Sequence, residues 1–567
     1  MHDSTWGITR LVKLWLRGRR ARATLPDWRR LREPQAAAET LPTCERVRVL
    51  LVTNVGSFLP GTILESLLGA ALSARGAECH VLLCDSALPA CLACEHRFYG
   101  GAERLSNLGP QADLCKSCFL PAAQCYEGLP VTLHRFSELL VDSERTEAAR
   151  TALEIAVEEI PRFSIDGLAV GEHAVAGALR FFARGDLDGE PFAEAIVRRY
   201  LEAALLTVFA TRRLLNDGFD VAVFHHGIYV PQGLVGEVAR SRGVRVVNWN
   251  AAYRKQCFIF SHEDTYHHTL MDEPPAVWES LPWSDAQEHR ILEYLRSRWD
   301  GRHDWITFQN APRLETEEIE KETGLDFTKP CVALLTNVVW DAQLHYPANA
   351  FSNMMDWVIG TIEYFRARPE VQLVIRVHPA EVRGSVPSRQ RVTDEIARVV
   401  GDLPANVFVI PPTSRISTYV VAEQSDSVII YGTKMGVELS SLGIPIIVAG
   451  EAWIRGKGVT LDAHSREEYF SILDRVPLGS RMDPAAVRRA RMYAYHFFFR
   501  RMIPVRSVRH RRGWPPFDVG IRTLDRLRSG VDPGLDVICD GILKGEPFVY
   551  PAEFLDGRGE NVASSVA

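Results

Sequence analysis

The stretch SVIIYGTKMGVELSSLGIPIIVAG, residues 427–450, contains the pattern that decides the fold. An apolar strand ends at Tyr431, Gly432 opens a helix, and a second apolar strand follows the Gly-Ile-Pro turn at 443–445. Two parallel strands need a helical crossover between them, so this order predicts a parallel sheet. We therefore expect an α/β, Rossmann-like domain whose loops at the carboxyl ends of the strands hold the ligand.

The start of the helix in this stretch has the chemistry of an anion site. Free N–H groups and the positive end of a helix dipole attract phosphate, and Gly432 lets it approach the backbone. Thr433 and Lys434 add a hydroxyl donor and a charge, and Glu438 lies in range of the vicinal hydroxyls of a ribose. An ordinary helix start with a solvated lysine would show the same residues, so the motif needs support from elsewhere in the chain.

That support comes from LVIRVHPAE, residues 373–381, where an apolar strand ends in a histidine and a proline. At the carboxyl edge of a parallel sheet His378 would lie beside the Gly432 turn, and Arg376 would point to the same face. The loop GEAWIRGKG adds Arg455 and Lys457 at the end of the next strand, where cations suit a phosphate or carboxylate. Taken singly, each of these residues also fits a structural role.

The same alternation of strand and helix signals divides the 567 residues into two doubly wound domains. RVRVLLVTN at 46–54 opens the first, and CVALLTNVVWD at 331–341 opens the second. We predict the following divisions: a basic N-terminal segment (1–45), a first domain (46–270) with a cysteine-rich insertion (86–127), a linker (271–328), a second domain (329–475) and a helical C-terminal region (476–567).

Residues from RVHPAE through YGTKMGVELSSLGIPIIVAGEAWIRGKGVT resemble the bacterial capsule polysaccharide synthesis family, which includes the Kdo transferases that build capsule linkers. The shared features are His378-Pro379, the Gly432-Thr433 turn leading to Glu438, Gly443-Ile444-Pro445, and the loop from Gly450 to Thr460. Two departures stand out. Val459 occupies the position of the usual leucine, and the four-cysteine insertion lies outside the common pattern.

This resemblance implies a GT-B fold, with an acceptor-side first domain and a second domain that holds a nucleotide sugar, in many relatives a CMP-sugar. His378 would meet the nucleotide phosphate, and Glu438 and the Gly432 turn would meet the nucleotide. The expected function is a glycosyltransferase that moves a sugar to a surface polysaccharide or lipid-linked acceptor. No catalytic metal is expected, because fixed donors can stabilise the leaving phosphate.

Two other functions fit the same layout. A nucleotide-sugar epimerase shares the two-domain form and would need no acceptor. A non-catalytic polysaccharide assembly protein could retain the fold and use its cysteines to dock a partner.

Glycosyl transfer needs a group that takes the proton of the acceptor hydroxyl, and the first domain offers candidates. VFHHG places His226 at the end of a strand, and FSHEDTYHH places Glu263 and Asp264 after another. Each of them could equally be structural.

Four of the 11 cysteines form two C-x-x-C pairs with the spacing C-x2-C-x20-C-x2-C: Cys91, Cys94, Cys115 and Cys118. Two such turns can bring four thiolates into a tetrahedron, which predicts a closed structural zinc site. An iron centre is the alternative, because ligand type does not separate the two metals here. His96 and Cys125 are spare ligands, and four unrelated cysteines are the remaining explanation.

The bulk composition limits the partners. A net charge of -6 argues against nucleic-acid binding, and no apolar window is long enough to span a membrane. The N-terminus lacks the features of a secretory signal, so we expect a cytoplasmic protein. Ile8, Leu11, Leu14 and Trp15 among basic residues fit a short amphipathic helix on the inner face of the membrane, and equally a disordered basic tail.

Overall fold

The computed structural model describes residues 15–31, 46–99, 101–299, 304–305, 312–341 and 346–555. The chain divides into two compact units, each with its own sheet. Unit 1 comprises 1–182, 187–266 and 502–550, and unit 2 comprises 183–186, 267–501 and 551–567.

Unit 1 is built on a seven-stranded sheet with the order β13-β6-β5-β4-β1-β2-β3. Strands β3, β2, β1, β4 and β5 are parallel, whereas β6 runs antiparallel to β5 and β13 antiparallel to β6. Its strands are β1 (Arg48–Asn54), β2 (Glu78–Leu83), β3 (Val131–Arg135), β4 (Val221–His225), β5 (Arg245–Ala251), β6 (Cys257–His262) and β13 (Ile503–Pro504), and β14 (Val508–His510) pairs with β15 (Phe517–Val519) in a separate hairpin.

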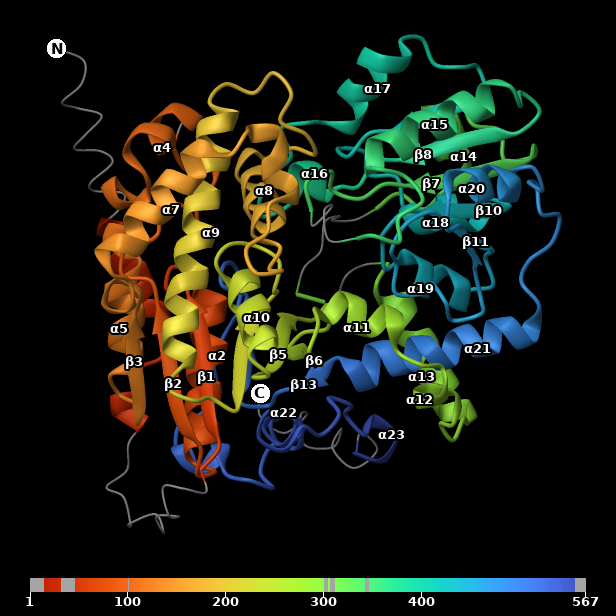
Figure 1. The fold of residues 1–567 in the computed structure, drawn as a ribbon. Coiled ribbons are helices and arrows are strands. Elements are labelled where there is room, and N and C mark those ends of the chain that lie inside the picture. The colour runs from red at the N-terminus through yellow and green to blue at the C-terminus, as the bar shows by residue number, and fades with distance from the viewer. Residues whose placement is uncertain are drawn as a thin grey trace. The chain divides into compact units, whose positions relative to one another are not determined.

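Helices cover both faces of this sheet (Figure 1). They are α2 (Leu59–Ser73), α3 (His96–Tyr99), α4 (Ala102–Leu108), α5 (Phe119–Tyr126), α6 (Phe136–Leu139), α7 (Asp142–Glu154), α8 (Val170–Phe182), α9 (Ala193–Leu215), α10 (Gln232–Ser241) and α22 (Pro533–Lys544).

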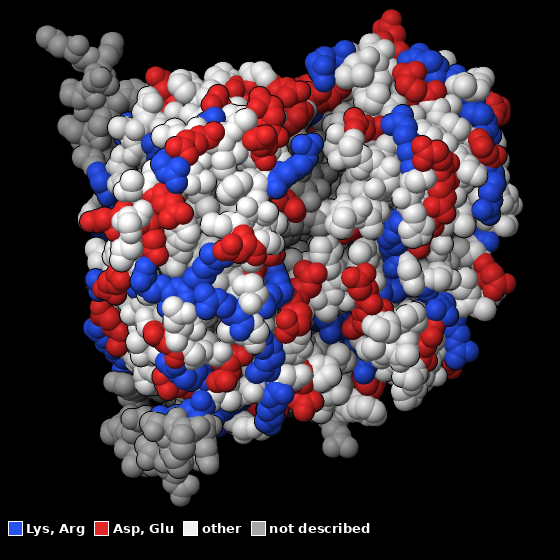
Figure 2. All heavy atoms as spheres, in the orientation of Figure 1, with Lys and Arg blue, Asp and Glu red and all other residues white. Residues whose placement is uncertain are grey.

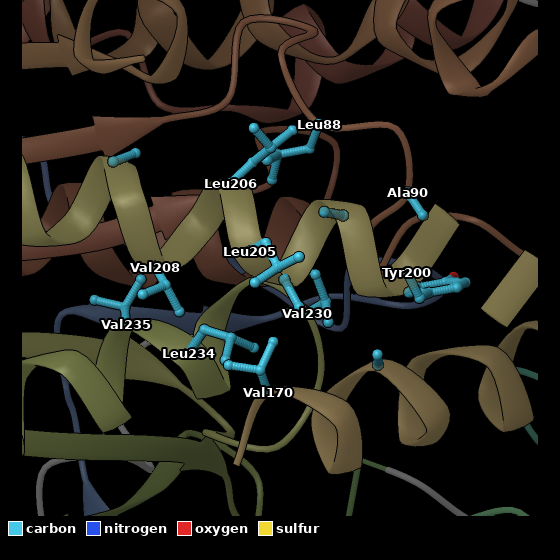
Figure 3. Close-up of a cluster of buried hydrophobic side chains, with 14 of the residues drawn as sticks. Leu88, Ala90, Val170, Tyr200, Leu205, Leu206, Val208, Val230, Leu234 and Val235 are labelled. Atoms are coloured by element: carbon cyan, nitrogen blue, oxygen red, sulfur yellow. The ribbon is translucent and has the colours of Figure 1, made fainter. Parts of the chain in front are cut away.

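The core of unit 1 follows the alternation of its strands. Leu50 and Val52 point to one face, where they join side chains of α8, α9 and α10, including Leu205 and Leu234 (Figure 3). Leu51 points to the other face, where α2 packs closely enough that a Cβ on Gly69 would lie 3.1 Å from the leucine Cδ1. Sequence alternation thus accounts for a sheet buried on both sides.

Unit 2 contains an all-parallel six-stranded sheet with the order β12-β11-β10-β7-β8-β9. Its strands are β7 (Cys331–Leu335), β8 (Gln372–Arg376), β9 (Val407–Ile410), β10 (Ser427–Ile430), β11 (Ile446–Val448) and β12 (Leu461–Asp462). Its helices are α11 (Tyr266–Asp272), α12 (Ala276–Glu279), α13 (Asp285–Ser297), α14 (Thr316–Thr323), α15 (Met354–Arg366), α16 (Ala380–Arg383), α17 (Val392–Val400), α18 (Thr418–Gln424), α19 (Met435–Ser441), α20 (Arg466–Leu473), α21 (Pro484–Tyr495) and α23 (Ala552–Leu555).

In unit 2, Val332 and Leu334 of β7 pack with side chains of α15, α17 and α20, such as Trp357 and Tyr469. The helices α18 and α19 contact the sheet at β7 and β11. The all-parallel sheet of unit 2 and the mainly parallel sheet of unit 1 confirm the expected fold class at the level of α/β architecture.

The structure differs from the predicted divisions in two places. The stretch 271–328, expected as a linker, contains α12, α13 and α14 and belongs to unit 2. The region 476–567, expected to be helical, also contains β13, β14 and β15, and its residues 502–550 belong to unit 1. Short strands at a sheet edge carry too few residues for a recognisable period, so the pattern missed them.

Basic and acidic side chains are interspersed on the face drawn in Figure 2, in keeping with the small net charge. Within the described ranges, no helix combines the length and the apolar character that crossing a bilayer requires. Most of the amphipathic N-terminal segment lies outside the described residues. Its described part is helical at 15–24, with Trp15 61% exposed.

Candidate functional site

The predicted site residues of unit 2 gather where the strand order reverses. Strands β8 and β9 extend from β7 in one direction, and β10, β11 and β12 extend in the other, so β7 and β10 flank the switch point. Ligands of doubly wound sheets bind outside the carboxyl ends of such strands. Asn337 follows β7 and Gly432 follows β10, and the Gly432 N–H donates a hydrogen bond to Asn337 Oδ1 over 3.2 Å.

His378 lies at this edge, directly after β8, as the sequence predicts. Its backbone N–H donates to Thr336 Oγ1 at 3.0 Å, and its Nδ1 accepts the N–H of Ala380 at 3.0 Å. Burial, with the charges of Lys434 and Arg376, lowers the pKa of His378 to about 3. The imidazole is therefore neutral at physiological pH, and the bond at Nδ1 assigns the ring proton to Nε2, which is then a directed donor.

Glu438 is 1% exposed and is held from three sides. Lys434 Nζ lies 3.0 Å from its Oε1, the Tyr419 hydroxyl donates to its Oε2 at 2.5 Å, and Arg298 Nε lies 3.0 Å from the same Oε2. Burial alone would raise the pKa of Glu438, but Arg298 and Lys434 overcome it and lower the pKa to about 2. Both carboxylate oxygens are thus occupied, so Glu438 orients two cations in this structure.

Arg298, which no sequence motif marked, also pairs with a second carboxylate. Its Nη1 forms an ion pair with Asp304, and Asp304 Oδ1 accepts the Tyr294 hydroxyl at 2.9 Å. This buried group therefore contains two cations, Arg298 and Lys434, and two carboxylates, Glu438 and Asp304. Beside it, Trp299 stacks on Tyr419, with 5.2 Å between ring centroids and 12° between ring planes.

A third buried carboxylate, Glu451, follows β11 at the same edge. Its Oε1 accepts the Ala348 N–H at 2.8 Å, and its Oε2 lies 3.2 Å from His268 Nε2 and 3.7 Å from His267 Nε2. The main-chain oxygen of Glu451 would lie 3.1 Å from a Cβ on Gly432. This close approach explains why glycine occupies the turn after β10.

Three of the predicted phosphate-binding cations have other partners. Arg376 donates to the carbonyls of Val377, Pro411 and Ser414, at 2.7–3.2 Å. Arg455 donates to the carbonyls of Gly450 and Ala463, at 3.1 and 2.8 Å. Lys457 Nζ donates to the carbonyls of Met271 and Glu273, at 2.7 and 2.8 Å. All three side chains are at most 5% exposed, and they hold loops together in this structure.

The helix expected to present free N–H groups, α19, has only seven residues. Thr433 Oγ1 accepts the Met435 N–H at 3.3 Å, so the hydroxyl also caps the chain at this point. Lys434 remains in the group around Glu438, where burial lowers its pKa.

The candidate bases of unit 1 come from two loops, and the chain after Asp264 returns toward His226, whose ring centroid lies 6.1 Å from that of Tyr266. His226 follows β4 and donates its N–H to Trp249 O, whereas Glu263 follows β6 and donates its N–H to Val246 O. Since β6 runs antiparallel to β5, Glu263 lies toward the amino end of β5, and the histidine lies toward its carboxyl end. The strand direction, which the local pattern did not reveal, separates them.

The two cysteine pairs lie near each other, because burial and then the nearby Cys91 and Cys118 thiols raise the pKa of the Cys115 thiol. Within the described residues, no group of three or more His, Cys, Asp or Glu side chains lies close enough to hold a metal ion. Each pair forms a tight turn, with the Cys94 N–H donating to Cys91 O and the Cys118 N–H donating to Cys115 O. The Ser57 N–H also donates to Cys118 Sγ at 3.3 Å. Zinc binding by these four cysteines stays a prediction.

Comparison with solved structures finds weak likenesses. The KpsC β-Kdo 2,4-transferase of Thermosulfurimonas dismutans is 12% identical with a TM-score of 0.35, and the match covers 55% of this chain and 88% of that one. The β-Kdo 2,7-transferase of the same KpsC is 9% identical with a TM-score of 0.30, over 51% and 80% of the two chains. The UDP-GlcNAc 2-epimerase of Neisseria meningitidis is 11% identical with a TM-score of 0.23, over 79% and 96%. Similarity at this level carries no argument about activity.

Comparison with protein families is more specific. No curated protein sequence matches the chain. The family model described as capsule polysaccharide biosynthesis protein matches residues 268–475, which contain His378, Lys434, Glu438 and Glu451. The resemblance expected from the His378-Pro379 and Gly432–Glu438 motifs is therefore confirmed, and residues 268–475 carry the sequence pattern of the capsule polysaccharide biosynthesis family.

Proposed function

We propose that this protein is a glycosyltransferase of capsule or surface polysaccharide synthesis. It transfers a sugar from a nucleotide donor, a CMP-activated acidic sugar, to a glycan or lipid-linked acceptor. The observation that carries the proposal is the combination of neutral His378 with Lys434 beside the β7–β10 switch point, inside the family match.

The chemistry of this group suits a nucleotide phosphate. His378 supplies an N–H donor that stays neutral, and Lys434 lies close enough to lower the pKa of that imidazole. Glu438 and Arg298 keep the lysine in place before any ligand arrives, which reduces the entropy lost on binding. A preorganised donor and cation would stabilise the phosphate as it leaves the sugar, without a catalytic metal.

A thermal-shift comparison of CMP, UDP and GDP tests the nucleotide site. Binding to the folded protein raises its stability by mass action, and at a hundredfold excess over Kd the gain is about 2.7 kcal/mol. We expect CMP to raise Tm more than UDP or GDP. Lys434→Met should remove the shift, whereas Lys321→Met, at an exposed lysine of α14, should retain it. A larger shift with UDP or GDP would contradict the CMP assignment.

A second assay separates transfer from epimerisation. The wild-type protein is incubated with CMP-linked Kdo, with and without a lipid-linked glycan acceptor. Acceptor-dependent release of CMP together with a heavier glycolipid supports transfer. Conversion of the nucleotide sugar to its epimer without an acceptor would contradict it.

A further inference from the structure

Unit 1 has a group of buried polar atoms at its own switch point, between β1 and β4. Asn54 ends β1 and is fully buried, with φ of 51°. Among the described residues, neither Nδ2 nor Oδ1 of Asn54 has a hydrogen-bond partner. Left-handed backbone is uncommon for non-glycine residues, and a buried amide without partners is costly. The amide without partners points to a polar ligand at this position.

His225 ends the neighbouring strand β4 and offers a second such atom. Its Nε2 lies 3.2 Å from Asn250 Oδ1, which assigns the ring proton to Nε2 and leaves a lone pair on Nδ1. In the described part of the chain, this buried Nδ1 has no hydrogen-bond partner. Ser57, in the loop that follows β1, adds a hydroxyl that lies beside the Cys118 thiol.

An aromatic path connects this polar group to the surface. The Phe58 ring lies 4.6 Å from the His225 ring, centroid to centroid, and 6.2 Å from the ring of Trp514. Trp514 is 60% exposed, although burying so large an apolar side chain would be favourable. An exposed tryptophan next to orphaned hydrogen-bonding atoms is a combination that the core of unit 1 does not explain.

The chemistry of these atoms selects the class of ligand. An amide, a hydroxyl and a neutral imidazole offer both donors and acceptors without net charge, which matches sugar hydroxyls, since each of those also donates and accepts. The indole ring of Trp514 offers a flat apolar surface to the C–H face of a pyranose. An anion would require a cation, and none of these four side chains supplies one.

We propose that Trp514, Phe58, Asn54, Ser57 and His225 form a sugar-binding site in unit 1. Its ligand is a neutral pyranose whose hydroxyls reach Asn54 and His225 Nδ1 while its ring lies against Trp514. The assignment of this sugar as the acceptor rests on the proposed function. The binding itself does not.

Saturation-transfer NMR on the full chain tests the site, with the methyl glycosides of glucose, galactose, mannose and N-acetylglucosamine as probes. We expect transfer to at least one glycoside, and a loss of affinity of about fivefold or more in Trp514→Ala. Trp15→Ala is a matched control, because Trp15 is exposed to the same extent, 61%. Asn54→Ala should weaken binding as well, with circular dichroism used to check its folding.

Two results would overturn the site: no saturation transfer to any probe on the wild-type chain, or equal affinity in Trp514→Ala and wild type. The nucleotide-binding site of unit 2 is tested independently, by the thermal shift with nucleotides. If glycosides bind but no nucleotide raises Tm, the proposed function fails and this site stands. If nucleotides raise Tm in wild type and in Trp514→Ala alike but no glycoside binds, the sugar-binding site fails and the proposed function stands.

Discussion

Glu438 and Arg298 form a buried ion pair, with 3.0 Å between Oε2 and Nε, and each has at least one further charged partner. Glu438 comes from α19 and Arg298 follows α13, so the pair joins two segments that lie far apart in the sequence. Removing Arg298 leaves Glu438 with Lys434, and removing Glu438 leaves Arg298 with Asp304, so the loss should stay below the roughly 3–5 kcal/mol that a buried charge without any partner costs.

We therefore expect Arg298→Met and Glu438→Gln each to lower the stability of unit 2, by less than that amount. The double variant should lose less than the sum of the single losses, because neither charge is then left alone. Chemical denaturation followed by tryptophan fluorescence measures the three values. As a control, Arg366→Met breaks an exposed pair with Glu363 and should have no measurable effect. Strict additivity of the two buried changes would contradict the pairing.

Glu65 predicts a pH dependence of stability in unit 1. The carboxyl accepts a hydrogen bond from Trp249 Nε1 at 2.9 Å, and burial raises its pKa from 4.5 to about 7. Between these values the folded protein binds more protons than the unfolded chain, so this group's contribution to stability falls as pH rises from about 4.5 to about 7. A pKa difference of one between the folded and unfolded states corresponds to about 1.4 kcal/mol. The ionisation of Glu65 should therefore lower the stability of the protein by about 3 kcal/mol across this pH range.

Glu65→Gln keeps the acceptor for Trp249 and removes the titration. Relative to wild type, the variant should gain stability between about pH 4.5 and about pH 7, and the difference should level off above pH 7. Urea denaturation across this range gives the difference directly. A constant difference at all pH values would show that the carboxyl titrates normally.

A substitution of Lys457 tests whether this lysine holds loops together or binds a phosphate. In Lys457→Met the carbonyls of Met271 and Glu273 lose their buried donor, which should cost about 1–3 kcal/mol of stability. CMP affinity at a temperature where the variant is folded should stay at the wild-type value, as measured by calorimetry. An unchanged Tm with a large loss of CMP affinity would instead favour the role predicted from the sequence.

The cysteine spacing predicts about one zinc ion per chain after purification without chelator. Cys115→Ser combined with Cys118→Ser should abolish metal binding and lower Tm, because a structural ion contributes folding energy. Elemental analysis measures the metal, and Cys331→Ser, at a buried cysteine of unit 2, is the control. Iron in place of zinc would select the alternative metal, and no metal at all would contradict the site.

The sequence by itself determined the α/β class and the position of His378. Alternating strand and helix signals are local, and a strand that ends in His-Pro places its histidine at the carboxyl edge of a parallel sheet whatever surrounds it. The motif around Gly432 and Glu438 likewise lies within one strand–helix unit, so its spacing was readable from one short stretch.

Only the tertiary structure decided which partners these residues meet. Strand alternation predicted the face of β8 on which Arg376 lies, but not its partners. In the structure its guanidinium donates hydrogen bonds to carbonyls of the loop after β9. Glu263 lies away from His226 because β6 is antiparallel, a direction that no local pattern encodes. Arg298 and Trp514 join their groups from distant segments, since long-range packing, and not residue spacing, brings such side chains together.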